Sequence, residues 1–239
     1  NRPSFSYRVR YAKVGTARFM GHLDLNRMFP RAIRRAGFLP SYSQGFHPIP
    51  QLAFGPPLRL GMAGLSEVMD LRLQQQVDPE ALQSALSAQC PEGIELRSIH
   101  AVGKDAPKLS AVTNWADVFV LVPREFAEGV RPDAINQLLA EAEILVERTT
   151  KKGKLKTIDI RPGIDSVSWI EEVPDDASEL MSVREDERML QMRICLQGDH
   201  PAKPEEILLR IFDGIIPAGT QVIRRRLLPS PTPACKILV

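Results

Sequence analysis

The 239-residue sequence contains few cysteines, and they are far apart. Cys90, Cys195 and Cys235 make an odd, scattered set, which is typical of the reducing cytoplasm rather than of a disulfide-stabilised secreted domain. No two of them have the spacing of metal ligands, which argues against a zinc or iron–sulfur site in this chain. We therefore expect a cytoplasmic protein that binds no metal through its own residues.

Other common sequence signals are absent as well. No apolar stretch approaches the roughly 18 residues that suggest a membrane span, and the first residues lack the apolar core of a secretory signal. The sequence also has no Gly-rich phosphate loop and no Ser–His–Asp signature. We expect no membrane partner. Because the chain begins with Asn1 rather than Met, we also expect a piece of a longer protein or a trimmed chain.

Charge is nearly balanced overall but unevenly distributed. The formal net charge is +2. Between Arg2 and Arg35, Lys and Arg are frequent and Asp24 is the only acid, whereas acids collect in "EEVPDDASEL" and "REDE" between Glu171 and Glu187. Such an asymmetry favours a surface that faces a polyanion on one part of the fold.

The first half of the chain predicts alternating strands and helices. Residues 5–14 alternate between apolar or aromatic and basic side chains, which predicts a half-buried strand with Arg8 and Arg10 on its polar face. Apolar residues at helical spacing predict a helix over 22–37, kinked or broken near Pro30 because proline removes a backbone hydrogen bond. The remaining predicted elements are a short strand over 51–55, a strand over 67–76, a helix over 78–89 and a strand over 93–102. The order β-α-β-β-α-β is that of the ferredoxin-like fold.

The second half repeats the pattern. Its predicted strands cover residues 115–123, 144–150, 154–162, 166–173, 188–197 and 219–229, and its helices cover 131–143 and 203–212. We therefore predict an α+β protein of two tandem ferredoxin-like modules with antiparallel sheets, the second with one extra strand. A polar connector over 102–114 places the first module in residues 1–104 and the second, with a C-terminal tail, in 105–239.

The basic first helix is the main candidate for contact with phosphate. Arg27, Arg31 and Arg34 or Arg35 recur at spacings of three and four, which places them in one row. Such a row can neutralise successive phosphates. It can also be an ordinary solvated helix face, but such a face usually carries both signs of charge. The basic residues that precede the helix extend the predicted RNA-binding set by Arg8, Arg10, Lys13 and Arg18.

The loop "SYSQGFHPIPQLAFG", from Ser41 to Gly55, combines aromatic residues with turn formers. Tyr42, Phe46 and His47 are candidates for stacking on RNA bases, because unpaired bases stack on aromatic side chains. The alternative is that Phe46 and Phe54 fill the core beneath a proline-stiffened loop. Both interpretations predict a loop that joins the basic helix to the sheet.

A second basic segment, "TKKGKLKTIDIRP", predicts a lysine-rich hairpin with Gly153 at its tip. Such a hairpin can follow a nucleic-acid backbone, or its lysines can prevent edge-to-edge pairing of strands. Asp159 is expected to form a salt bridge with Arg161 on one strand face, because the two residues are two positions apart. The RNA-binding candidates of this segment are Lys151, Lys152, Lys154, Lys156 and Arg161.

His22 is the only candidate for a catalytic residue. It lies where the first strand and its loop lead into the basic helix, and a histidine there could serve as general acid or base near a phosphodiester. His47 could be its partner. Alternatively, His22 is hydrogen-bonded to the backbone at the start of the helix. Asp24 is expected to cap that helix or to pair with Arg27 or Arg31.

Several blocks of the sequence resemble the uncharacterised radical-SAM-linked domain family. They are "FMGHLDL", "RAIRRAG", "YSQGFHPIPQLAFG", "SEVMDLRL" and "KLKTIDIRP". The resemblance implies a domain that stands alone or follows a radical S-adenosylmethionine domain. It also implies that an iron–sulfur cluster and S-adenosylmethionine belong to that fused or partner domain and not to this chain. The junction that carries His22 also looks like RAMP-type endoribonucleases, which cut RNA without metal, but fold-level analogy is a weak argument for function.

Three functions follow from these observations. The first is a non-catalytic module that binds tRNA or rRNA and presents it to a radical-SAM enzyme for RNA modification. The second is a protein-interaction domain that docks the radical-SAM partner through its sheet or its acidic region. The third is a metal-independent, RAMP-like endoribonuclease that uses His22. We expect this chain alone not to be an enzyme, with the alternative that it is part of a radical-SAM enzyme.

Overall fold

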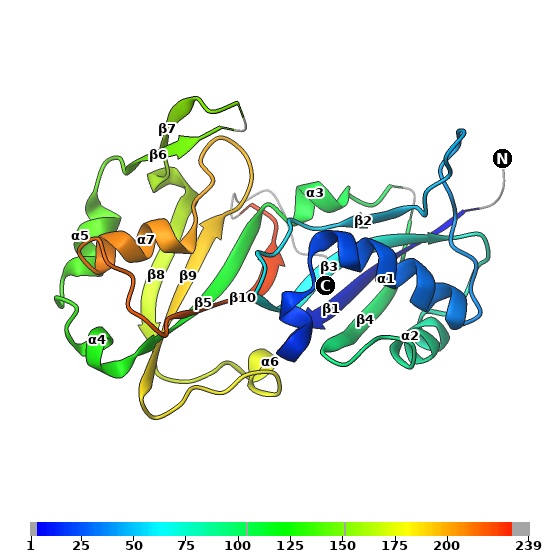
Figure 1. The fold of residues 1–239 in the computed structure, drawn as a ribbon, viewed down its shortest axis with the longest axis horizontal. Coiled ribbons are helices and arrows are strands. Elements are labelled where there is room, and N and C mark those ends of the chain that lie inside the picture. Colours follow the sequence, from blue (N-terminus) through cyan, green and yellow to red (C-terminus); the bar gives the residue numbers. More distant parts are fainter. Residues whose placement is uncertain (1–3, 104, 151, 231–239) are drawn as a thin grey trace. The chain divides into compact units, whose positions relative to one another are not determined.

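The computed structural model describes residues 4–103, 105–150 and 152–230 (Figure 1). The chain divides into two compact units, Asn1–Thr113 and Asn114–Val239. The division lies at the end of the polar connector, whereas the sequence placed it after residue 104. Each unit has a mixed α+β architecture with an antiparallel sheet.

The first unit contains a four-stranded antiparallel sheet in the order β4-β1-β3-β2. Its main elements follow one another as strand, helix, strand, strand, helix and strand, which is the order that the sequence predicts. They are β1 (Phe5–Lys13), η1 (Gly15–Phe19), α1 (His22–Arg35), β2 (Leu52–Phe54), β3 (Ala63–Leu73), α2 (Pro79–Ser87), β4 (Ile94–Val102) and α3 (Leu109–Val112).

The core of this unit lies between one face of the sheet and the helices α1 and α2 (Figure 1). Tyr7, Val9 and Tyr11 of β1 are buried there, together with Phe29 of α1 and Leu82 of α2. The Tyr11 and Phe29 rings meet edge to face, with centroids 5.2 Å apart. Since side chains alternate along a strand, Arg8 and Arg10 lie on the opposite face of the sheet.

The helix α1 continues through Pro30, so the expected break does not occur. Pro30 is buried beside Phe29 and Ile33, and burial of this apolar face offsets the roughly 3 kcal/mol that proline costs inside a helix. The side chain of Asp24 accepts a hydrogen bond of 2.9 Å from the backbone N–H of Gly21. Of the two roles expected for Asp24, the structure therefore shows capping.

In the second unit, four strands pair antiparallel in the order β10-β5-β9-β8. A separate hairpin joins β6 to β7. The expected helix over 131–143 is shorter than predicted and follows another short helix. The elements are β5 (Trp115–Pro123), α4 (Arg124–Glu128), α5 (Ala134–Ala140), β6 (Leu145–Thr149), β7 (Leu155–Asp159), η2 (Arg161–Gly163), β8 (Ile164–Ile170), α6 (Asp175–Ser178), β9 (Glu187–Cys195), α7 (Pro204–Ile211) and β10 (Gln221–Leu228).

The two units share one order of strand pairing. When these four strands of each unit are counted along the chain, both sets run fourth, first, third, second. In the second unit the hairpin β6–β7 is inserted between the first and second of these strands. All six strands predicted for this half are therefore present, and they include two strands beyond the shared four, whereas one extra strand was expected.

A buried carboxylate joins three strands of the second sheet. Asp117 of β5 is fully buried and accepts hydrogen bonds from Arg193 of β9 (2.7 Å) and Arg226 of β10 (2.8 Å). Burial raises the pKa of Asp117, but the hydrogen bonds and charges of the two guanidinium groups outweigh burial and hold this pKa below its ordinary value.

Candidate nucleic-acid interface

A row of arginines runs along the outer face of α1. Arg27, Arg31 and Arg34 are exposed and lie opposite the buried face of the helix. With a rise of about 1.5 Å per residue, Arg31 is roughly 6 Å further along the axis than Arg27, and Arg34 roughly 4.5 Å beyond that. The α-carbons of these arginines therefore follow one another along a single line. Guanidinium groups in such a row can contact successive phosphates of a nucleic-acid backbone.

Two members of this row have no partner among the residues that the structure describes. Arg27 and Arg31 form neither an ion pair nor a side-chain hydrogen bond with any residue that the structure describes. By contrast, Arg148 forms a short ion pair with Glu206, and Arg210 with Glu141. The guanidinium groups of Arg27 and Arg31 are therefore available to an external anion.

The third member, Arg34, connects the row to the aromatic loop. Its Nη1 donates a hydrogen bond of 3.3 Å to the hydroxyl of Tyr42. Tyr42 also forms an isolated β-bridge with Pro50, and this bridge closes the base of the loop. The arginine row is therefore joined to the base of the loop. We call these residues together the α1 interface: Arg27, Arg31, Arg34, Tyr42 and Phe46.

The loop between Tyr42 and Pro50 is a narrow hairpin that projects from the unit (Figure 1). The backbone N–H of Ser43 donates to the carbonyl of Ile49 (2.8 Å), and the N–H of Ile49 donates to the Ser43 hydroxyl (3.0 Å). Phe46 at its tip is fully exposed. Phe46 is therefore not a core residue, whereas Phe54 packs against the core with its ring 5.9 Å from that of Phe29.

Other predicted basic residues are engaged elsewhere in the first unit. Arg8 pairs with Asp70 at 2.8 Å on the sheet face opposite α1. Arg10 lies on that same face and donates to Ser66. Arg35 donates to the side chain and the carbonyl of Gln89. The structure therefore does not bring all the basic residues of the first segment onto one surface.

Lys13 is buried rather than exposed, with 1% of its surface accessible. Its ammonium donates to the carbonyls of Arg18 (3.1 Å) and Met20 (2.9 Å). These two bonds hold the segment η1 against β1. A signal for this role was present in the sequence, because Lys13 follows Tyr11 by two positions and so shares its buried face.

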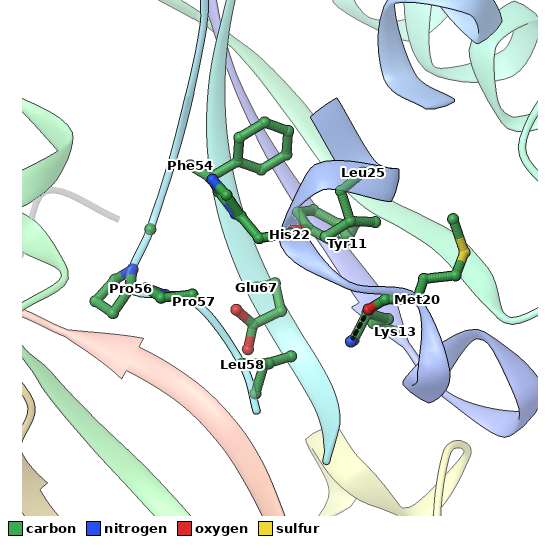
Figure 2. Close-up of a pocket in the computed structure, with 11 residues that line it drawn as sticks. Tyr11, Lys13, Met20, His22, Leu25, Phe54, Pro56, Pro57, Leu58 and Glu67 are labelled. Carbon is green, nitrogen blue, oxygen red and sulfur yellow. Dashed lines mark hydrogen bonds between the residues drawn. The ribbon is translucent and has the colours of Figure 1, made fainter. Parts of the chain in front are cut away.

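His22 lies at a small depression of the first unit, beside Phe54 (Figure 2). The two rings meet edge to face, with centroids 5.3 Å apart. The depression encloses about 310 Å³, part of which is open solvent. The His22 ring makes no hydrogen bond with any described residue, so the expected backbone bond is not found. The residues around the depression are Tyr11, Lys13, Met20, His22, Leu25, Phe54, Gly55, Pro56, Pro57, Leu58 and Glu67.

Glu67 was missed by the sequence interpretation. It is 4% exposed, pairs with Tyr11 in the register of β1 and β3, and lines the same depression as Lys13 and His22 (Figure 2). Gly64 makes room for it, because a Cβ there would stand 2.5 Å from a carboxylate oxygen of Glu67. A buried acid in an alternating strand is a signal of a charge held by buried partners.

His47 and His22 belong to opposite ends of α1. His22 is its first residue, whereas the loop that carries His47 begins at Tyr42, beside Arg34 near the end of the helix. Arg34 is roughly 18 Å further along the helix axis than His22. This arrangement gives no support to an acid–base pair of the two histidines.

The lysine-rich segment forms the predicted hairpin, β6–β7. Lys152, Lys154 and Lys156 are exposed, and Lys151 lies outside the described residues. Arg161 lies beyond the hairpin in η2, and its guanidinium donates to the carbonyls of Leu139 and Ile164.

The expected salt bridge between Asp159 and Arg161 is replaced by a different contact. A carboxylate oxygen of Asp159 accepts from the backbone N–H of Ile144 (2.9 Å) and from that of Arg161 (3.0 Å). The Ile144 bond first, and then the Arg161 bond, hold the pKa of Asp159 below its ordinary value. Asp159 and Arg161 thus both bind backbone groups at a junction of the chain.

Some of the acidic residues in the second unit form ion pairs with arginines of the same unit. Asp176 of α6 pairs with Arg225 at 2.5 Å, and the buried Glu187 pairs with Arg184 at 2.9 Å.

Among the described residues, no group of three or more His, Cys, Asp or Glu side chains could hold a metal ion. No helix in the same residues is long and apolar enough to cross a membrane.

We predict that the thiols of Cys90 and Cys195 are unreactive in the folded protein. Burial raises the pKa of Cys90 to about 11, an effect that the charge of Arg35 only partly offsets. Burial also raises the pKa of Cys195, and its Sγ–H donates to the carbonyl of Gln197. At pH 8 a thiol with a pKa of about 11 is ionised to roughly one part in a thousand, and the thiolate is the reactive form.

The measurement is the rate of maleimide labelling, with Cys235→Ser as background because Cys235 lies outside the described residues. We expect labelling in urea to be complete within a time that leaves the folded protein almost unmodified. Equal rates in the two conditions would contradict the burial of both thiols.

Comparison with known proteins gives one family. Residues 6–193 match the sequence model of a family described as uncharacterised proteins conserved in bacteria (DUF2344). The curated proteins include no match to the sequence. Among solved structures, an unknown protein from Galdieria sulphuraria is 14% identical, over 93% of this chain and 98% of that chain, with a TM-score of 0.27.

Proposed function

The chain belongs to the DUF2344 family of uncharacterised proteins conserved in bacteria, and we propose that it is an RNA-binding module, not itself catalytic, that presents tRNA or rRNA to a radical-SAM enzyme. The observation that carries the proposal is the row of exposed arginines on α1, of which Arg27 and Arg31 have no partner among the described residues. Unpaired guanidinium groups beside exposed aromatic rings combine phosphate contacts with base stacking.

The strand order supports two ferredoxin-like modules as the scaffold of this function. Each main sheet is antiparallel and runs fourth, first, third, second, with helices between the first and second and between the third and fourth strands. This order follows from the split β-α-β arrangement. In this proposal the first module supplies the α1 interface and the second supplies the lysine hairpin.

The radical-SAM partnership rests on the resemblance of the blocks around α1 and the aromatic loop. In this proposal the iron–sulfur cluster and S-adenosylmethionine are held by the fused or partner domain, which acts in the cytoplasm.

The test is a titration of structured RNA at several salt concentrations. We expect the logarithm of the association constant to fall linearly with the logarithm of salt concentration. Replacing Arg27 and Arg31 with alanine should reduce this slope by about 0.7–0.9 for each arginine that contacts a phosphate, and should weaken binding to all sequences alike.

The matched control replaces two exposed arginines of the second unit, Arg124 and Arg131, and should leave the slope unchanged. Micromolar or weaker binding without salt dependence would overturn the proposal. Cleavage of the RNA in EDTA, abolished by His22→Ala in a folded protein, would instead support a nuclease. Retention of the radical-SAM partner without RNA would favour a docking domain.

A further inference from the structure

We propose that Phe19 is a stacking platform for an unpaired base, so that the α1 interface takes single-stranded RNA, a loop or an end, rather than a duplex. This inference rests on the proposed function and narrows its substrate class. It is carried by an exposed aromatic ring that the sequence interpretation did not select.

Phe19 is the last residue of η1, and 58% of its surface is exposed. The guanidinium carbon of Arg18 lies 4.9 Å from its ring centroid. The backbone at Gly61 lies against the ring edge: a Cβ at Gly61 would be 3.6 Å from Phe19 Cε1. The N–H of Gly61 donates to the carbonyl of Arg18 at 3.0 Å, which ties this segment to η1. Arg18 therefore covers one face of the Phe19 ring and Gly61 contacts its edge, while more than half of the Phe19 surface is exposed to solvent.

The surroundings of Phe19 favour a nucleic-acid base as its occupant. Arg18 contributes a positive charge directly at the ring, and its buried Nε has no hydrogen-bond partner among the described residues. Leu23, four residues after Phe19, and Leu60, the residue before Gly61, add exposed apolar surface, with 69% and 71% of their surfaces accessible. A base offers a planar apolar face, and the phosphate attached to it offers the negative charge that an arginine beside the ring attracts.

Phe19 lies before the arginine row in the chain. It is three residues ahead of the first residue of α1, whereas Tyr42 contacts Arg34 near the other end of that helix. The span from the first turn of α1 to Arg34 is roughly 18 Å at about 1.5 Å per residue. Along the chain, the arginines of α1 are thus preceded by Phe19 and followed by Tyr42, and a span of this length suits about four nucleotides of a single strand.

A duplex cannot use such a surface fully. Its bases are stacked on one another and paired, so that an exposed ring on the protein has no free base face to contact. The arginine row would still bind duplex phosphates, because that attraction is independent of sequence and of pairing. Phe19 should therefore contribute to the binding of single strands and contribute nothing to the binding of duplexes.

The experiment compares an unstructured ten-nucleotide RNA with a duplex of the same length at fixed salt. Phe19→Ala should weaken binding of the single strand about five- to 150-fold, the range that a stacked base contributes, and leave duplex binding unchanged. Phe19→Trp should retain the affinity. Its added indole fluorescence should be quenched by the single strand and not by the duplex.

The control variant is Phe126→Ala, which removes a phenylalanine of α4 that is 43% exposed, and it should change neither affinity. Circular dichroism checks that each variant is folded. If the wild-type protein binds RNA in a salt-dependent manner but Phe19→Ala binds the single strand normally, the stacking inference is overturned and the proposed function stands. Equal affinity of the wild-type protein for the single strand and for the duplex would also overturn the stacking inference and leave the proposed function standing. If no RNA binds in a salt-dependent manner, the proposed function itself fails.

Discussion

Replacing Asp117 with alanine should destabilise the second unit by about 3–5 kcal/mol, because it leaves two guanidinium groups without the buried carboxylate between them. Arg193 and Arg226 are 33% and 36% exposed, whereas Asp117 is fully buried. The arginines come from β9 and β10, on either side of β5. Without the carboxylate, the two positively charged guanidinium groups face each other with no negative charge between them.

The same ion cluster predicts how stability depends on pH. Hydrogen bonds hold the pKa of Asp117 below its ordinary value of 3.8, although burial opposes them. A group whose pKa is lower in the folded state contributes stability above its unfolded pKa, and this contribution disappears as the pH falls through the folded pKa. The difference between the wild-type protein and Asp117→Ala should therefore be constant near neutrality and shrink only below about pH 4.

Urea unfolding followed by tryptophan fluorescence measures this effect, because Trp115 and Trp169 both belong to the second unit. The matched control is Asp176→Ala. It removes a carboxylate that also binds an arginine, Arg225, but is 48% exposed. A partly exposed pair of this kind should contribute about 1 kcal/mol or less. Equal losses for the two variants would show that burial of Asp117 does not set its contribution.

The parts of the fold that follow from local periodicity were predictable. The alternation in β1 identified its buried face, and the apolar spacing in α1 identified both the helix and its outer row of arginines. The continuation of the helix through Pro30 has a physical cause. Helix propensity includes the lost backbone bond, but the burial of Phe29 and Ile33 around the proline depends on a sheet formed by distant segments. Propensity alone cannot include that term.

The partners of individual charges could not be predicted in the same way. Arg8, Arg27 and Arg161 are equally basic in the sequence. In the structure, Asp70 of a neighbouring strand binds the first, no described residue binds the second, and backbone carbonyls bind the third. Asp70 is 62 residues away from Arg8 in the chain, and the register of β1 and β3 brings the two residues together. An interface identified from charge alone therefore includes arginines whose guanidinium groups bind other groups of the protein, such as Arg8 and Arg161.

The block "KLKTIDIRP" shows this most clearly, since it is distinctive in sequence and yet serves as a structural junction. Asp159 binds two backbone N–H groups, and its own carbonyl lies 2.8 Å from Nδ1 of His200. Gly163 follows two residues after Arg161 and is buried. The segments around η2 and His200 are therefore in close backbone contact, which a side chain would disturb.

Replacing Gly163 with alanine should consequently destabilise the second unit by about 3 kcal/mol or more, at the upper end of the cost of overpacking. The added Cβ would stand 1.9 Å from the carbonyl oxygen of His200 and 3.3 Å from Cβ of Cys195. The His200 segment cannot retreat without loss, because the N–H of Ala202 donates to the carbonyl of Cys195 at 2.8 Å.

Gly129→Ala is the matched control for Gly163→Ala. It lies at the end of α4 with φ −77°, and its nearest neighbour to an added Cβ is at an ordinary 3.4 Å. Alanine fits such a backbone, so this variant should unfold within about 0.5 kcal/mol of the wild-type protein. Both variants are measured by urea unfolding with the same tryptophan signal. If Gly163→Ala retained wild-type stability, the contact between η2 and the His200 segment would not be as close as the structure shows.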